Sequence, residues 1–133
     1  MAVIDASVWI AFLKGVGNDE FHEQAKQIIR SLIPNQERIC LPAIVFTEVA
    51  GAIKRSTKDN DFARGAVLYM KELELKIFAN FSELEPIATE IAITHSIRGA
   101  DAYYLAVAKM TKSNLYTFDK QQKEAFDTIS KTW

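Results

Sequence analysis

The sequence predicts a single α/β domain over residues 1–133, in which helices flank a central, mainly parallel sheet of short strands. Short apolar runs alternate with segments whose apolar residues follow helical spacing, as in parallel α/β proteins. The length suits one domain, and the chain has no internal repeat, low-complexity tract or linker. Hydrophobic residues make up 49% of the chain and charged residues 25%, which argues against disorder and indicates a sizeable core.

The first half of the chain alternates between predicted strands and helices. In order, these are a strand over 2–4, a helix over 8–13, a helix over 21–33, a strand over 39–41 and a helix over 43–55. Ser7 is placed to cap the first helix and Gly15 to end it, and residues 15–19 are predicted as a loop. Pro34-Asn35 is expected to end the second helix.

The second half continues this alternation. In order, we predict a helix over 62–73, a strand over 75–78, a helix over 84–92, a helix over 100–110, a strand over 114–118 and an edge strand over 128–133. Ser82 is expected to cap the helix over 84–92, with Glu85 in the capping-box position. The helix over 100–110 is apolar almost all round, which predicts that most of its surface is buried.

Charge and cysteine content narrow the function classes. The net charge of -1 gives no overall positive field, so any contact with nucleic acid would have to be local and metal-assisted. Cys40 is the only cysteine, so no intrachain disulfide forms, and a buried thiol is expected. The two histidines have no cysteine neighbours, which makes a structural zinc site improbable. Neither a signal peptide nor a membrane-spanning apolar window is found, and we expect a cytoplasmic protein.

Four acidic residues occupy positions that are unusual for surface acids. Asp5 follows the first predicted strand and Asp119 follows the strand over 114–118. In open parallel sheets, ligands bind beyond the carboxyl ends of the strands. Glu48 lies on or beside the apolar stripe of its helix, and Asp101 lies in the first turn of the most apolar helix. The pattern predicts that the four carboxylates converge at one edge of the sheet.

Each acid also has a structural interpretation. Asp5 and Asp101 could stabilise helix N-termini, Asp119 could open a turn, and Glu48 could pair with Lys54-Arg55. If the four converge, however, two carboxylates ~4 Å apart repel by about 4 kcal/mol at an effective dielectric constant of ~20. A bound cation relieves that repulsion. An all-oxygen site without His or Cys suits Mg²⁺ or Mn²⁺, and phosphodiester hydrolysis is the chemistry that such a site supports.

Short motifs surround each of the four acids. They are Val3-Ile4-Asp5-Ala6-Ser7, Phe46-Thr47-Glu48-Val49, Arg98-Gly99-Ala100-Asp101-Ala102 through Ala106, and Leu115-Tyr116-Thr117-Phe118-Asp119. In order and separation they resemble the PIN-domain family, and most of all its VapC-type toxin ribonucleases, over essentially the whole chain. The resemblance implies a PIN-like fold and a Mg²⁺-dependent ribonuclease. It also implies that Asp5, Glu48, Asp101 and Asp119 are the catalytic, metal-binding acids.

The resemblance carries further expectations about the site and its partners. Ser7 and Thr117 would orient a metal-binding carboxylate or a water, with a helix cap and a plain strand residue as their structural alternatives. VapC-type proteins act on RNA, form homodimers and are held inactive by a small antitoxin protein. These interactions follow from the resemblance alone.

The basic and aromatic residues do not define where an RNA would bind. Lys14, Lys54-Arg55 and Arg98 are candidate phosphate contacts, although a solvated surface charge is the better explanation of each. Trp9 and Tyr103-Tyr104 could stack bases, or belong to the core or to a dimer interface.

Other classes fit less well. A haloacid-dehalogenase phosphatase needs a second Asp two residues after Asp5, where this chain has Ser7, and a receiver domain needs an acidic neighbour of Asp5 and a late lysine. The remaining alternative is a PIN scaffold that binds RNA or a protein with little or no catalytic activity. Retention of all four acids argues against this alternative, because their mutual repulsion would serve no purpose in a scaffold.

Overall fold

The computed structural model describes the chain apart from Val16, Asn18, Asn35 and Gln36. Its strands form one sheet in the order β3-β2-β1-β4. The strands are β1 (Ala2–Ile4), β2 (Ile39–Pro42), β3 (Leu75–Phe78) and β4 (Asn114–Tyr116). Ala2 pairs with Ile39 on one side and with Asn114 on the other, and every pairing described is parallel. The predicted α/β class with a parallel central sheet is confirmed.

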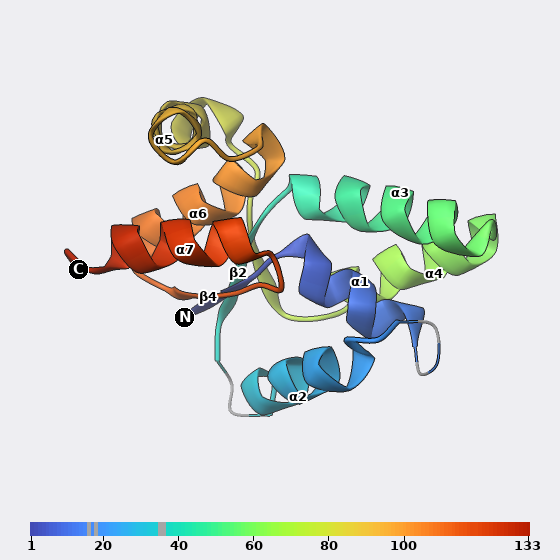
Figure 1. Cartoon of the computed structure of the whole chain (residues 1–133). Coiled ribbons are helices and arrows are strands. Elements are labelled where there is room, and N and C mark those ends of the chain that lie inside the picture. The colour runs from blue at the N-terminus through green and yellow to red at the C-terminus, as the bar shows by residue number, and fades with distance from the viewer. Residues whose placement is uncertain (16, 18, 35–36) are drawn as a thin grey trace.

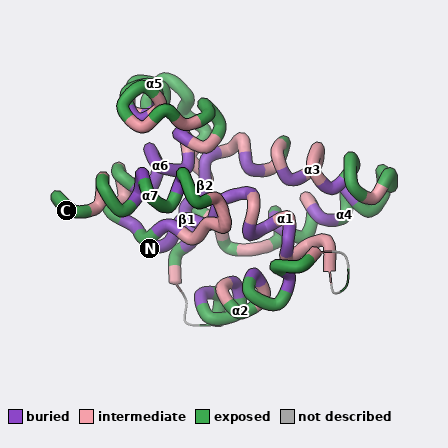
Figure 2. The backbone as a smooth tube through the Cα atoms, viewed as in Figure 1, coloured by how far each residue is buried: buried purple, intermediate pink, exposed green. Residues whose placement is uncertain are grey.

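Helices connect the strands and cover the sheet. They are α1 (Ala6–Lys14), α2 (His22–Leu32), α3 (Ile44–Thr57), α4 (Asn60–Lys71), α5 (Phe81–His95), α6 (Gly99–Thr111) and α7 (Lys120–Ser130). Figure 1 shows α5, α6 and α7 as one group and α1 to α4 as another, with the short strands between them. Helix α6 packs on β1, β2 and β4, and its middle is buried, as its apolar sequence predicted. Both β1 and β2 are buried along their whole length (Figure 2), so the core surrounds them.

Two predicted helix caps are wrong, because other side chains accept the hydrogen bonds from the free amides at the helix N-termini. Helix α1 is capped by Asp5, whose carboxylate accepts a hydrogen bond from the Val8 amide, and not by Ser7. Helix α5 begins earlier than predicted and is capped by Asn80, not by Ser82. Gly15 ends α1 as predicted, with φ at 87°, where a residue with a side chain would be strained.

The C-terminal elements also differ from the prediction. Strand β4 ends at Tyr116, because Thr117 and Phe118 turn toward the start of α7. The predicted edge strand over 128–133 is the last turn of α7 and the residues after it. The predicted loop over 15–19 and the break at Pro34-Asn35 lie partly outside the described residues.

Several single residues settle which alternative holds. Trp9 is fully buried and its indole N–H donates to the Ile4 carbonyl at 3.1 Å, and Tyr104 is also buried. The core interpretation is therefore confirmed for both, and neither ring is available for base stacking. Cys40 is buried, as predicted. Among the described residues, no helix has the length and apolarity to span a bilayer.

Candidate active site

Asp5 stands directly after β1 and is only 3% exposed. The Ser7 hydroxyl donates to its Oδ1 at 2.5 Å, and the Thr117 hydroxyl donates to its Oδ2 at 2.6 Å. The Val8 amide adds a longer bond of 3.4 Å to Oδ1. Desolvation by burial nevertheless raises the pKa of Asp5 from 3.8 to about 6, since it outweighs these donors. The carboxylate is thus fixed in orientation while its charge is disfavoured.

The two hydroxyls also fix the segment that follows β4. Ser7 Oγ accepts a hydrogen bond from the Phe118 amide at 3.1 Å, and Thr117 Oγ1 accepts one from the Asp119 amide at 2.9 Å. Each hydroxyl therefore links Asp5 to the backbone that carries Asp119. The contacts to Asp5 agree with the positions expected from the resemblance, and the effect of the hydroxyls on catalysis stays a prediction.

Glu48 faces α6 from α3 and is partly buried. Its Oε1 accepts a hydrogen bond of 2.7 Å from the hydroxyl of Tyr104, which lies 56 residues further along the chain. Burial raises the pKa of Glu48, and the charge of Asp101 raises it further, although the Tyr104 bond opposes the shift. The salt bridge with Lys54-Arg55, which was the structural alternative for Glu48, is not among the described ion pairs.

Asp101 and Asp119 each lie at the beginning of a helix. Asp101 is in the first turn of α6, and burial raises its pKa, an effect that nearby Arg98 opposes. Arg98 Nε donates to Asp101 Oδ2 at 3.4 Å, but the Arg98 side chain is 83% exposed, so this ion pair is solvated and weak. Asp119 caps α7 by accepting a hydrogen bond from the Gln122 amide at 2.9 Å, rather than opening a simple turn.

The four carboxylates influence one another electrostatically. The charge of Asp101 raises the pKa of both Asp5 and Glu48, and the charge of Asp119 raises that of Asp101. Four distant segments are therefore brought to one negatively charged region. Within the described part of the chain, the Arg98–Asp101 contact is the only ion pair that involves any of them.

The donor chemistry of this region fits a hard divalent cation, because the groups that could bind a metal are carboxylates and the nearby Arg98 side chain is largely exposed. Within the described residues, no three or more Asp, Glu, His or Cys side chains are arranged to hold a metal ion by themselves. This is compatible with Mg²⁺, which keeps several waters and is commonly held by one or two carboxylates together with substrate phosphates. Joint coordination by all four acids stays a prediction.

Gln122 is a site residue that the sequence analysis missed. Its side chain is fully buried, and Nε2 donates to the Asp101 carbonyl at 3.0 Å. Its Oε1 lies 3.0 Å from the Thr117 hydroxyl, as a second, more distant acceptor for the proton that Thr117 donates to Asp5. Gln122 therefore joins the start of α7 to the start of α6 and to the hydroxyl that holds Asp5. Nothing in the polar run Lys120-Gln121-Gln122-Lys123 distinguishes this glutamine from its neighbour.

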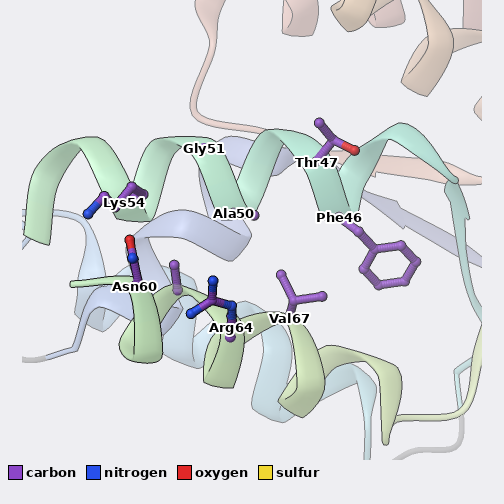
Figure 3. A pocket seen from close by; sticks show the side chains of 9 residues that line it. Phe46, Thr47, Ala50, Gly51, Lys54, Asn60, Arg64 and Val67 are labelled. Carbon is purple, nitrogen blue, oxygen red and sulfur yellow. The ribbon is translucent and has the colours of Figure 1, made fainter. Parts of the chain in front are cut away.

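A separate groove runs between α3 and α4 and has a volume of about 510 Å³. Figure 3 shows that Lys54 and Arg64 come from opposite sides of it and that Phe46 and Val67 lie toward its other end. None of the four carboxylates lines this groove, although Thr47 at its wall is the neighbour of Glu48. The groove is therefore distinct from the carboxylate region.

The sheet is parallel, with Asp5 and Asp119 directly beyond the ends of two neighbouring strands, which is the edge where open α/β sheets generally bind ligands. Residues 2–126 match the family model described as the PIN domain, and the chain belongs to this family. The predicted PIN-like fold is confirmed. A search of curated proteins found no match.

Solved structures share this fold. VapC20 of Mycobacterium tuberculosis, described as a sarcin-ricin loop cleaving toxin, is 23% identical, with a TM-score of 0.80 over 94% of this chain and 95% of that one. FitAcB of Neisseria gonorrhoeae is 22% identical, with a TM-score of 0.66 over 96% of this chain and 94% of that one. FitAB bound to an IR36 DNA fragment is 23% identical, with a TM-score of 0.64 over 96% of this chain and 91% of that one. At such identities the likeness shows the fold.

Proposed function

We propose that this chain is a metal-dependent ribonuclease that hydrolyses RNA phosphodiester bonds at Asp5, Glu48, Asp101 and Asp119. The observation that carries the proposal is the buried Asp5 carboxylate, whose charge is disfavoured and yet held by two hydroxyls next to other carboxylates. Such an arrangement is unfavourable for folding alone and favourable for binding a cation. Membership of the PIN-domain family supports it.

The four acids would hold Mg²⁺, or Mn²⁺ in its place. When bound, the divalent cation supplies Lewis-acid stabilisation of the negative charge on the phosphate oxygens. The protein contributes orientation. Ser7 and Thr117 fix both oxygens of Asp5, and Tyr104 fixes Glu48. Because these bonds hold the carboxylates in place beforehand, little reorganisation is needed when cation and RNA arrive.

We further propose that the chain is the toxin of a VapBC-type toxin–antitoxin pair, acting in the cytoplasm as a homodimer and inhibited by a small antitoxin protein. This rests on the fold shared with VapC20, which is described as a toxin. Growth arrest on induction of the chain in a bacterial host, with relief by Asp5→Asn, is the expected result. Normal growth with soluble, folded wild-type chain would count against the toxin role.

The nuclease activity is tested with purified protein and single-stranded RNA. Cleavage is expected in Mg²⁺ or Mn²⁺, none in EDTA, and none with Asp5→Asn. Asp59→Asn is the matched control, because Asp59 caps α4 as Asp5 caps α1 but lies outside the site. Cleavage that persists in Asp5→Asn, or that fails equally in Asp59→Asn, would refute the assignment. RNA binding without any turnover in the wild type would favour the non-catalytic scaffold.

A further inference from the structure

A second cavity, of about 340 Å³, adjoins the carboxylate region. It is lined by Ser7, Ile10, Ala11, Asp19, Phe21, Phe118 and Asp119. Two of these residues belong to the candidate active site, since Ser7 holds Asp5 and Asp119 is one of the four acids. A molecule whose phosphate lies at the carboxylates therefore has its neighbouring groups within reach of this cavity. Its volume falls at the lower end of the range typical of small-molecule sites, about 300–1,000 Å³.

Two aromatic rings form one side of the cavity. Phe21 and Phe118 stack with ring centroids 4.9 Å apart and an interplanar angle of 24°. Phe21 is 38% exposed and Phe118 is partly exposed, so the pair is accessible to solvent. Phenylalanines this exposed lose hydrophobic stabilisation unless something covers them.

The backbone amides of Phe21 and Phe118 are both hydrogen-bonded to side chains that line the same cavity. The Phe21 amide donates to Asp19 Oδ1 at 2.8 Å, and the Phe118 amide donates to Ser7 Oγ at 3.1 Å. The Ser7 hydroxyl, which accepts the second of these bonds, also donates to Asp5. The aromatic pair is thus positioned relative to the carboxylates before any ligand binds, which lowers the ordering cost of binding.

We propose that this cavity is a subsite for one nucleobase of a single-stranded RNA, next to the phosphate at the carboxylates. The proposal rests on the proposed function. Every base has a π-face that can stack on an aromatic side chain, so the subsite tolerates different bases. The charged side chains of the lining are Asp19, which pairs with Lys14 at 3.6 Å, and Asp119. Among the described residues that line the cavity none is Lys or Arg, so the lining itself offers a phosphate no cation, and the uncharged base is the part of the nucleotide that fits.

The test compares two RNA probes of equal phosphate number: a 12-nucleotide oligo(A), and an abasic 12-mer that lacks the bases. Binding is measured by fluorescence anisotropy with Asp5 intact and with Ca²⁺, which also takes oxygen ligands, in place of Mg²⁺, and the probes are checked afterwards for cleavage. The quantity of interest is the ratio of the two dissociation constants, because contributions from the phosphate backbone cancel in it. Phe21→Ala is expected to lower the preference for oligo(A) by about five- to 150-fold. Phe21→Tyr should retain the preference.

Phe62→Ala is the matched control. Phe62 is 42% exposed, and an aspartate, Asp59, binds its amide, as Asp19 binds that of Phe21. It lies on α4 and does not line this cavity. If Phe21→Ala does not fold, as judged by its melting transition, Phe21→Leu replaces it, because leucine keeps the apolar bulk without the ring.

Each outcome separates the subsite from the nuclease. An unchanged ratio in Phe21→Ala, or an equal fall in Phe62→Ala, overturns the subsite, and RNA cleavage by the wild type would then still support the nuclease. A Phe21-dependent ratio in a chain that never cleaves RNA in Mg²⁺ supports the subsite and overturns the nuclease. Failure to bind either probe overturns the subsite, and absence of RNA cleavage in Mg²⁺ as well overturns the nuclease.

Discussion

Replacing Asp5 by asparagine is expected to stabilise the metal-free protein at neutral pH. The substitution removes a buried negative charge and keeps the side-chain shape. Asparagine is as good a helix cap as aspartate, so the bond to the Val8 amide is retained. The new amide N–H₂ also finds an acceptor. Thr117 can turn its hydroxyl proton to Gln122 Oε1, 3.0 Å away, and accept from the amide in turn.

The size of this effect follows from the pKa of Asp5. Burial raises it from 3.8 to about 6 in the folded state, so the folded chain binds the proton more tightly than the unfolded chain does. Wild-type stability therefore falls as pH rises from about 4 to about 6, and the penalty is constant above that. A shift of about two units corresponds to about 3 kcal/mol, which is the largest gain expected for Asp5→Asn at pH 8. Near pH 4 the gain should vanish.

Urea unfolding in EDTA, at pH 8 and at pH 4, measures both values. A variant less stable than the wild type at pH 8, or a gain in stability that does not depend on pH, would refute the reasoning.

The response to Mg²⁺ is a second test of the role of Asp5. Titrated to about a hundred times its dissociation constant, Mg²⁺ should stabilise the wild type by about 2.7 kcal/mol at pH 8 and leave the variant nearly unchanged. Equal stabilisation of both proteins would exclude Asp5 as a ligand.

The remaining predictions concern the groups around Asp5. Tyr104→Phe should lower the free energy of unfolding in urea by about 1–3 kcal/mol, because Glu48 loses its hydrogen-bond donor. It should also raise the Mg²⁺ concentration needed for half-maximal cleavage. If both values are unchanged, Tyr104 does not position Glu48. Glu48→Gln and Asp101→Asn should each raise the melting temperature in EDTA, since burial and neighbouring negative charges raise the pKa of both acids. A lower melting temperature in both variants would argue against a crowded acidic site. Gln122→Ala should cost at least about 2 kcal/mol, because it removes a fully buried side chain and its hydrogen bond to the Asp101 carbonyl. A loss below about 0.5 kcal/mol in urea unfolding would show that the bond is not needed.

The sequence was sufficient for features that depend on short-range pattern. Alternating apolar runs and helical spacing predicted the parallel sheet, because a strand buried on both faces needs a continuous apolar run such as Ala2–Ile4. The convergence of Asp5 and Asp119 also followed, since the carboxyl ends of adjacent parallel strands lie at one edge. The prediction for these two acids needed only their position relative to the strands.

Contacts between distant segments could not be predicted in this way. Tyr104 lies in an apolar helix that predicts burial, but nothing local shows that its hydroxyl reaches Glu48. Ser7 does not cap α1, because its hydroxyl donates to Asp5 and accepts from the amide of Phe118, which follows the neighbouring strand β4. Such competition among several good capping residues is settled by tertiary packing and not by propensity.

The hydrogen bonds that orient the carboxylates and the negative charge of these carboxylates have opposite effects on the stability of the metal-free chain. Hydrogen bonds from Ser7, Thr117 and Tyr104 position the carboxylates in the protein itself, without any ion. What disfavours the cluster is its charge, not its geometry. Amide replacements of the acids should therefore stabilise the metal-free chain, whereas removal of the groups that hold them should destabilise it. An acid that served only as a helix cap would change little in stability on replacement by its amide, because asparagine caps as well as aspartate, so a clear gain in the amide variants is the distinguishing result.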